Sequence, residues 1–133
     1  MDEHPRMMQP CPCGSGETLE ECCAPIIRDQ SAPTAEALMR SRYTAYVLRE
    51  EQYLMDTWHP DKRPRTLMLD DQQRWLGLRI KRTEDGQPGD DAGLVEFVAR
   101  YKIAGRGFRL HEVSRFLCIN GKWLYVDGDF PEN

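Results

Sequence analysis

The fold of this chain is decided by residues 95–126, which read VEFVARYKIAGRGFRLHEVSRFLCINGKWLYV. Apolar side chains recur at alternate positions from Val95 to Ile103, which is the period of a β-strand with one buried face. Gly105-Arg-Gly indicates a hairpin, and Asn120-Gly121 is a strong signal for a two-residue hairpin turn. The stretch therefore predicts three antiparallel strands, over residues 95–103, about 108–119 and 122–126.

Upstream residues complete the pattern. Leu76, Leu78 and Ile80 alternate with polar or small residues and predict a fourth strand, which the turn-rich sequence EDGQPGDD follows. Earlier in the chain, apolar residues spaced three and four apart predict a helix over about 35–49, with Thr34 as its N-cap. A second helical stretch is expected over about 51–58. Helices first and a four-stranded meander after them make the expected fold class α+β.

Composition excludes several classes of protein. The 133 residues are 40% hydrophobic and 30% charged, enough for one compact domain. No apolar run reaches about 18 residues, so no membrane-spanning helix and no membrane partner is expected. The start of the chain is polar and acidic, without the pattern of a secretory signal. The expected location is therefore the cytoplasm.

The distribution of charge disfavours nucleic acid as a partner. Residues 1–30 contain six acidic and two basic residues, a net charge of −4 that equals the formal charge of the whole chain. The remaining residues contain 16 of each kind, with no clustered basic excess. Because phosphate neutralisation supplies much of the affinity of nucleic-acid binders, we do not expect this function.

The cysteines are the most specific signal. Four of the five lie within thirteen residues, in the pattern CxC-x₈-CC: Cys11, Cys13, Cys22 and Cys23. Two close pairs joined by a glycine-containing loop are typical of a structural, tetrahedral Zn²⁺ site, whereas a secreted disulfide framework would spread its cysteines along the chain. Two alternatives stay open: unligated reduced thiols, and a redox or catalytic pair, which the lack of a neighbouring histidine disfavours.

The residues around these cysteines have local roles. Gly14 and Gly16 can take positive φ and fold the loop back over a metal ion. Thr18 and Glu21 have the spacing of a capping box, which predicts a helical turn before Cys22, and Pro25 is expected to end that turn. A short connector is expected at 26–33. We therefore expect a zinc-binding module in residues 1–30 and an α+β domain in residues 31–133.

These residues also carry a family resemblance. Cys11-Pro-Cys-Gly-Ser-Gly-x₅-Cys22-Cys23 resembles the SEC-C motif, the zinc module also found in the translocase ATPase SecA. The remainder resembles the YchJ family of small bacterial proteins, through AEALMRSRYTAY at 35–46, TWHP at 57–60, WLGL at 75–78, VEFVARY at 95–101, HEVSRF at 111–116 and WLYVDG at 123–128. The resemblance implies a nuclear-transport-factor-like cone, in which helices pack on a curved antiparallel sheet, behind an N-terminal zinc knuckle. SEC-C motifs commonly have lysines between the cysteine pairs, whereas this chain has glutamates, so the partners of SecA are not implied.

Cone-shaped folds of this type often enclose a cavity, and four charged residues are candidates for its lining: Arg42, Glu96, Arg100 and Glu112. Glu96 and Arg100 share one parity on their strand, so both point to one face of the sheet. Cross-strand ion pairs with Glu112, joined by Arg42 from the helix, are the expected arrangement. An ion-pair ladder that fixes strand register and helix docking, and binds no ligand, is the interpretation that these residues favour over a ligand site.

Two functions are compatible with these features. The first, favoured by the specificity of the cysteine motif, is an interaction protein whose structural zinc module recruits a protein partner. The second is a small-molecule-binding protein, or an enzyme, that uses the cone cavity. No nucleophile–base pair names a reaction, so an enzyme is the less favoured form. Loss of one cysteine ligand is expected to disorder residues 10–25 and to leave the sheet domain folded.

Overall fold

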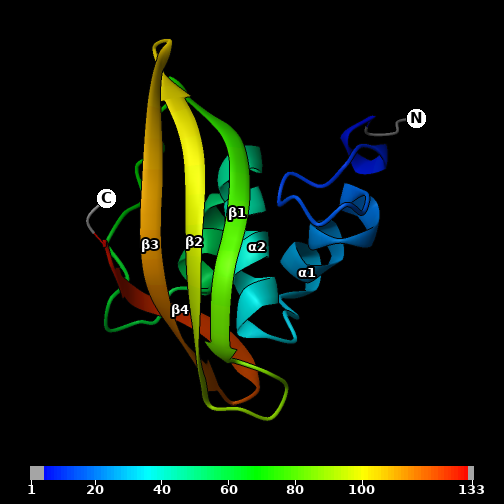
Figure 1. Ribbon diagram of the computed structural model, residues 1–133. Coiled ribbons are helices and arrows are strands. Elements are labelled where there is room, and N and C mark those ends of the chain that lie inside the picture. Colours follow the sequence, from blue (N-terminus) through cyan, green and yellow to red (C-terminus); the bar gives the residue numbers. More distant parts are fainter. Residues whose placement is uncertain (1–4, 132–133) are drawn as a thin grey trace.

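A curved sheet of four antiparallel strands, in the order β1-β2-β3-β4, wraps around helix α2 in the computed structural model, which describes residues 5–131 (Figure 1). The strands are β1 (Gln73–Asp85), β2 (Ala92–Ile103), β3 (Arg106–Ile119) and β4 (Lys122–Asp129). The helical elements are η1 (Pro5–Met8), η2 (Leu19–Glu21), α1 (Cys23–Asp29), α2 (Ala35–Leu48) and α3 (Glu51–Asp56). The predicted α+β class is confirmed. Residues 1–4 and 132–133, the outer ends of the two predicted segments, lie outside the described residues.

The inner face of the sheet packs on α2. Val95 lies opposite Ser114, and Phe97 lies opposite Glu112, so these four side chains share one face of the β2–β3 pair. Val95 and Phe97 join Leu38 of α2 in the hydrophobic core. None of the helices in residues 5–131 is long and apolar enough to cross a membrane.

Helix α2 begins and ends as its sequence requires. The Thr34 hydroxyl accepts the N–H of Ala37 at 3.0 Å, which confirms the predicted N-cap. At the other end, Arg49 takes a left-handed conformation with φ of 62°. The β1–β2 turn approaches the start of α2 so closely that a Cβ atom on Gly86 would lie 2.7 Å from the Cβ of Ala35. Glycine at this turn therefore allows the sheet and α2 to meet.

The segment after α3 closes one end of the cone against β4. The backbone N–H of His59 donates to the carbonyl of Tyr125, and the N–H of Tyr125 donates to the carbonyl of Thr57, both at 2.8 Å. This bridge brings the ring of Trp58 against that of Tyr125, with 5.4 Å between ring centroids. Two aromatic side chains from distant parts of the sequence thereby meet at one place.

Two local predictions have different outcomes. Asn120 and Gly121 have φ of 52° and 80°, as the predicted two-residue turn requires. Pro25, by contrast, ends no helix. It lies in the first turn of α1, where a backbone N–H has no acceptor within the helix and proline is tolerated. The predicted connector at 26–33 is therefore wrong over 26–29, which α1 occupies.

Candidate functional site

The four clustered cysteines bring their sulfur atoms together as a metal site requires. All four Sγ atoms lie within 4.8 Å of one another. The Sγ of Cys22 is 3.7 Å from that of Cys13 and 3.9 Å from that of Cys23. Zn–S bonds of about 2.3 Å in a tetrahedron place the sulfurs roughly 3.8 Å apart, so the spacing and the donor set fit Zn²⁺. All five cysteines of the chain are free, and these four can hold a metal ion.

Backbone hydrogen bonds fold this loop back on itself. The N–H of Cys11 donates to the carbonyl of Glu17 at 2.7 Å, and Gly14 and Gly16 take the expected positive φ of 82° and 94°. The Thr18 hydroxyl accepts the N–H of Glu21 at 3.3 Å, which confirms that side of the predicted capping box. The two cysteine pairs are therefore brought together by turns encoded between them.

The thiols perturb one another strongly. Hydrogen bonds from the thiols of Cys11 and Cys23 lower the pKa of Cys13, whereas the bond to Cys11 raises the pKa of Cys23. Burial raises the pKa of Cys22 to about 11. A lone cluster of this kind shares few negative charges among its sulfurs, because thiolates so close together repel one another. A cation at the centre would remove that repulsion, which is a second feature of the cluster that fits a metal ion.

The cysteine loop packs on the rest of the chain. The Sγ of Cys11 lies 3.6 Å from the hydroxyl of Thr44, and Arg40 donates to the carbonyl of Cys13 at 2.8 Å. Leu48 and Leu78 pack against the buried cysteines. The loop therefore packs on α2 and β1 (Figure 1), a contact that no local sequence pattern indicates.

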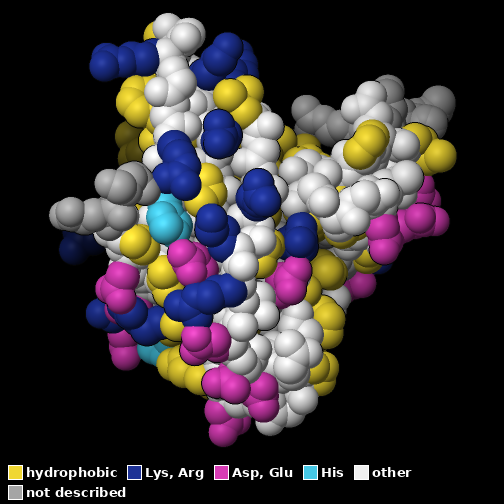
Figure 2. Space-filling model, viewed as in Figure 1, with side chains coloured by type: hydrophobic (Ala, Val, Ile, Leu, Met, Phe, Trp, Pro, Cys, Tyr) yellow, Lys and Arg dark blue, Asp and Glu magenta, His cyan; other side chains and the backbone are white. Residues whose placement is uncertain are grey.

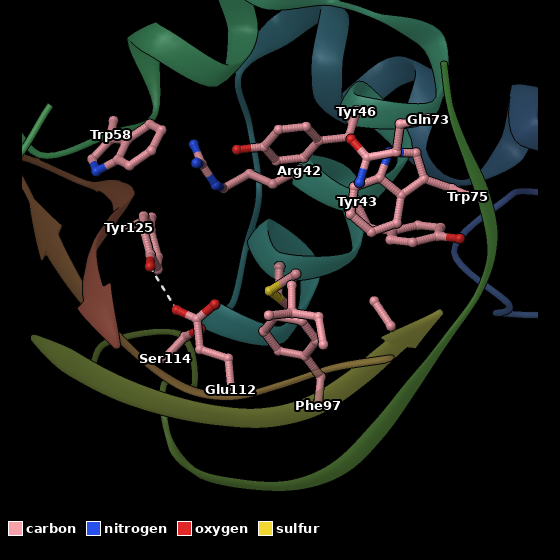
Figure 3. Close-up of a pocket in the computed structure, with 13 residues that line it drawn as sticks. Arg42, Tyr43, Tyr46, Trp58, Gln73, Trp75, Phe97, Glu112, Ser114 and Tyr125 are labelled. Atoms are coloured by element: carbon pink, nitrogen blue, oxygen red, sulfur yellow. Dashed lines mark hydrogen bonds between the residues drawn. The ribbon is translucent and has the colours of Figure 1, made fainter. Parts of the chain in front are cut away.

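A cavity of about 280 Å³ lies between α2 and the inner face of the sheet (Figure 3). Its lining includes six aromatic side chains, and residues of α2, the segment after α3 and all four strands contribute to it. Of the four residues predicted to line such a cavity, the structure brings two together there, Arg42 and Glu112. Ser114, on the same face of β3 as Glu112, joins them.

Arg42 is buried at one end of the cavity, with 4% of its surface exposed. Its Nη1 donates to the carbonyl of Leu54 at 2.9 Å and to the hydroxyl of Thr57 at 2.7 Å. The guanidinium carbon lies 5.0 Å from the ring centroid of Trp58 and 4.9 Å from that of Tyr125, as in cation–π contacts. Burial lowers the pKa of Arg42, but a guanidinium stays protonated in proteins. The cavity therefore contains a buried cation.

Glu112 is buried on the opposite wall, with 6% of its surface exposed. One carboxylate oxygen accepts the hydroxyl of Tyr125 at 2.6 Å (Figure 3), and burial raises the pKa of Tyr125, so that the hydroxyl keeps its proton. The backbone of Gly128 lies against this carboxylate: a Cβ there would be 2.8 Å from the carboxyl carbon. The hydroxyl of Ser114 is fully buried and has no hydrogen-bond partner within residues 5–131.

Glu96 and Arg100 do not reach the cavity, and the expectation that they share a face with Glu112 is wrong. Glu96 lies opposite Val113 and Arg100 opposite Arg109, on the outer face of the sheet. Alternation is known within one strand, but which residues of two strands face the same way depends on their register, and a shift of one residue reverses it. The expected ion pairs with Glu112 therefore do not form.

On that outer face Glu96 has other partners. It accepts hydrogen bonds from Nε2 of His111 at 2.7 Å and from Nε of Arg82 at 2.8 Å. Figure 2 shows further Lys and Arg side chains over this face, where Arg79, Lys81 and Arg100 border a shallow groove. The competing hypothesis, an ion-pair ladder of the four candidate residues, is therefore also wrong in its partners, because within residues 5–131 Glu96 pairs with Arg82 and His111 and with none of the other three.

Sequence reasoning did not single out Trp58, Tyr125 or Gly128 for this site. Trp58 and Tyr125 form the walls around Arg42, and Tyr125 also donates a hydrogen bond to Glu112. Gly128 gives Glu112 the space for its carboxylate. These roles depend on contacts between α2, β3 and β4, and no local sequence pattern signals them.

Comparison with known proteins agrees with the architecture. The model of the middle, NTF2-like domain of YchJ matches residues 34–128, and the SEC-C motif matches residues 9–25. A solution structure of a SEC-C motif containing protein from Rhodopseudomonas palustris superposes with a TM-score of 0.78 at 34% identity, covering 92% of this chain and 98% of that chain. A crystal structure of a SEC-C motif containing protein from Psychrobacter arcticus gives 0.75 at 26% identity, covering 96% and 86%.

Sequence relatives cover nearly the whole chain. A UPF0225 protein of Chromobacterium violaceum is 52% identical over 123 residues, which span 89% of this chain and 90% of that one. A UPF0225 protein of Streptomyces coelicolor is 50% identical over 122 residues, spanning 91% and 95%. The resemblance in the sequence is thus confirmed: the chain belongs to the YchJ family, with a SEC-C motif in front of an NTF2-like domain.

Proposed function

We propose that this protein binds a small molecule in the cavity between α2 and the inner face of the sheet. The observation that carries the proposal is the pair of buried charges, Arg42 and Glu112, which face the same cavity without forming an ion pair with each other. Buried charges are costly unless they are paired, so a protein that keeps them apart gains by pairing them with something else. The unpartnered hydroxyl of Ser114 adds a third polar group on the same wall.

The cysteine cluster has a supporting role in this proposal. The four thiolates hold one Zn²⁺ with no open position, so the ion is structural and carries out no reaction. It keeps the loop on α2 through Thr44 and Arg40, one turn of helix or less from Arg42. A site made of reduced thiols is stable in a reducing compartment, which is why we place the protein in the cytoplasm.

Native mass spectrometry of gently purified protein tests both parts together. We expect the mass of the chain plus one zinc ion, and a further small mass that is absent from the variant Glu112→Gln. Glu96→Gln, with its change on the outer face, is the matched control and should retain that mass. The proposal fails if the protein carries no small mass and the dialysable fraction of a bacterial lysate does not raise its melting temperature.

A second function, recruitment of a protein partner by the cysteine module, is supported by the module's surface. Glu17, Glu20 and Glu21 are exposed and make no ion pair within the described part of the chain, and acidic side chains gather over this module in Figure 2. Such a surface favours a basic partner. Replacing the three glutamates by glutamine should abolish salt-sensitive capture of specific proteins, whereas identical capture by both forms would exclude the adaptor.

A further inference from the structure

We infer that the ligand of the cavity is a small zwitterion, an amino acid with an apolar side chain, whose carboxylate pairs with Arg42 and whose ammonium group pairs with Glu112. This inference rests on the proposed function and names the chemical class of the ligand.

Arg42 has N–H groups that form no hydrogen bond within the described chain. A guanidinium has five N–H groups, and among residues 5–131 the hydrogen bonds of Arg42 all run through Nη1. Its two protein acceptors are a carbonyl and a hydroxyl, so no carboxylate balances its charge. The remaining N–H groups match a planar carboxylate, which arginine binds in a bidentate manner. An anionic group therefore belongs at this end of the cavity.

The wall opposite Arg42 has two hydrogen-bond acceptors that are not fully used. Tyr125 occupies one oxygen of Glu112, which leaves the other oxygen without a partner in the described chain. The hydroxyl of Ser114 lies two residues further along the same face of β3 and is also unpartnered. An ammonium group has three N–H donors and no acceptor, so it satisfies both groups at once. A cation with several donors therefore belongs at this end.

The side chain of Tyr125 contacts both Arg42 and Glu112 and therefore determines how the two charges are spaced. Arg42 lies over the face of its ring at 4.9 Å, and Glu112 accepts from its hydroxyl at 2.6 Å. The cation therefore lies over the face of the ring and the carboxylate lies beyond its hydroxyl, and within the described chain the two groups form no ion pair with each other. A molecule whose acid and amine sit on the same or neighbouring carbon atoms spans this gap. A ligand with only one charge would leave the other buried and unpaired.

The rest of the cavity wall is mostly apolar. Tyr43, Tyr46, Trp75 and Phe97 present aromatic surface to the rest of the cavity (Figure 3). A small cavity with apolar walls and a few polar groups favours a ligand that is apolar apart from its polar end. An aliphatic or aromatic side chain on the amino acid meets that condition, whereas a charged side chain would not.

Three matched probes test the ligand class by calorimetry on the metal-loaded full chain. L-Phenylalanine carries both charges, 3-phenylpropionate lacks the amine and phenethylamine lacks the carboxylate. A second set with a smaller body consists of L-leucine, 4-methylpentanoate and isopentylamine. In at least one set the amino acid should bind, and both of its singly charged analogues should bind roughly 30-fold more weakly or worse, because each leaves one buried charge unpaired.

Two variants make the test specific to the charges. Glu112→Gln keeps the volume of the side chain and an acceptor for Tyr125, so it should reverse the preference and bind the carboxylate-only probe more tightly than the amino acid. Glu96→Gln, on the outer face, should leave every affinity unchanged.

The outcomes separate this inference from the proposed function. If the wild-type protein binds a singly charged probe as tightly as the amino acid, the zwitterion is wrong and small-molecule binding stands. If no probe binds but native mass spectrometry shows a retained small mass, the ligand class is again wrong. If neither binding nor a retained mass is found, both proposals fail.

Discussion

The two faces of strands β2 and β3 each contain a carboxylate that is buried or half-buried, and they differ in the partners that the carboxylate has. On the outer face, Glu96 has a histidine and an arginine within hydrogen-bond distance. On the inner face, Glu112 has one tyrosine hydroxyl, although the cation Arg42 lines the same cavity. On the outer face, the protein itself therefore supplies cationic partners for the carboxylate. The inner charges are held apart, and this difference is what points to a ligand.

The largest effect is expected from removing the metal, which should destabilise the helices that cover the inner face more than the strands of the sheet. The cysteine loop is packed on α2, and α2 closes the inner face. Structural zinc contributes about 10–16 kcal/mol to the folding of small zinc-finger peptides, so a fall of several kcal/mol in the free energy of unfolding is expected here. Hydrogen exchange should show lost protection in α1 and on the side of α2 that the cysteine loop covers, with β2 and β3 still protected.

Cys118→Ser is the control for that experiment, because Cys118 lies outside the cluster on β3 and should change stability far less. A chelator that extracts the metal without lowering the melting temperature would contradict a structural ion. Loss of protection throughout the sheet would show that the loop and the sheet domain fold as one unit.

Gly128→Ala should damage the inner face alone. A Cβ at this position would lie 2.8 Å from two carbon atoms of the Glu112 side chain, so the carboxylate must move away from Tyr125. Overpacking of this kind costs about 1–3 kcal/mol, measured as a lower free energy of unfolding in urea. Gly107→Ala, where an added Cβ meets nothing within 4 Å, is the matched control. Equal effects of the two substitutions would disprove the close fit around Glu112.

Ser114→Ala should have a smaller effect and of the opposite sign. The Ser114 hydroxyl is buried without a partner in the described chain, and a hydroxyl in that state costs free energy. Its removal should raise the free energy of unfolding of the ligand-free protein by about 1 kcal/mol while weakening the binding of an amino acid. Lower stability together with unchanged binding would mean that the hydroxyl serves the fold and not the ligand.

The smallest effect should come from the outer face and depend on pH. The hydrogen bond from His111, and then that from Arg82, lower the pKa of Glu96. A carboxyl whose pKa is lower in the folded state stabilises the fold above its unfolded pKa of about 4.3, and this contribution is lost as the pH falls through the folded pKa. Glu96→Gln should therefore lower the urea midpoint slightly at about pH 7 and leave it unchanged at about pH 2.

Glu17→Gln, which alters an exposed carboxylate without an ion pair in residues 5–131, should show no such pH-dependent difference. If the effect of Glu96→Gln grew as the pH fell, the partners of Glu96 would not be those that the structure shows.

Much of the fold follows from local patterns, and the exceptions have physical reasons. The N-cap at Thr34 and the turn at Asn120 depend on neighbouring residues only, so sequence reasoning predicts them. The prediction that a helix ends at Pro25 is wrong because proline disrupts only the interior of a helix and is tolerated in its first turn, where Pro25 lies. The prediction that Glu96 and Glu112 share a face is wrong because the register between two strands depends on both strands together and cannot be derived from either one alone.

The sequence by itself determined the α+β class and the four clustered cysteines that can hold a metal ion, because hydrophobic period and a motif of thirteen residues act over short stretches of chain. Only the tertiary structure decided which charges share a space. It placed Arg42 and Glu112, 70 residues apart, around one cavity, and it gathered bases such as Arg79 and Arg100 on the outer face. Strand register, and the packing of α2 against the sheet, produce both results, and neither is written in any local segment.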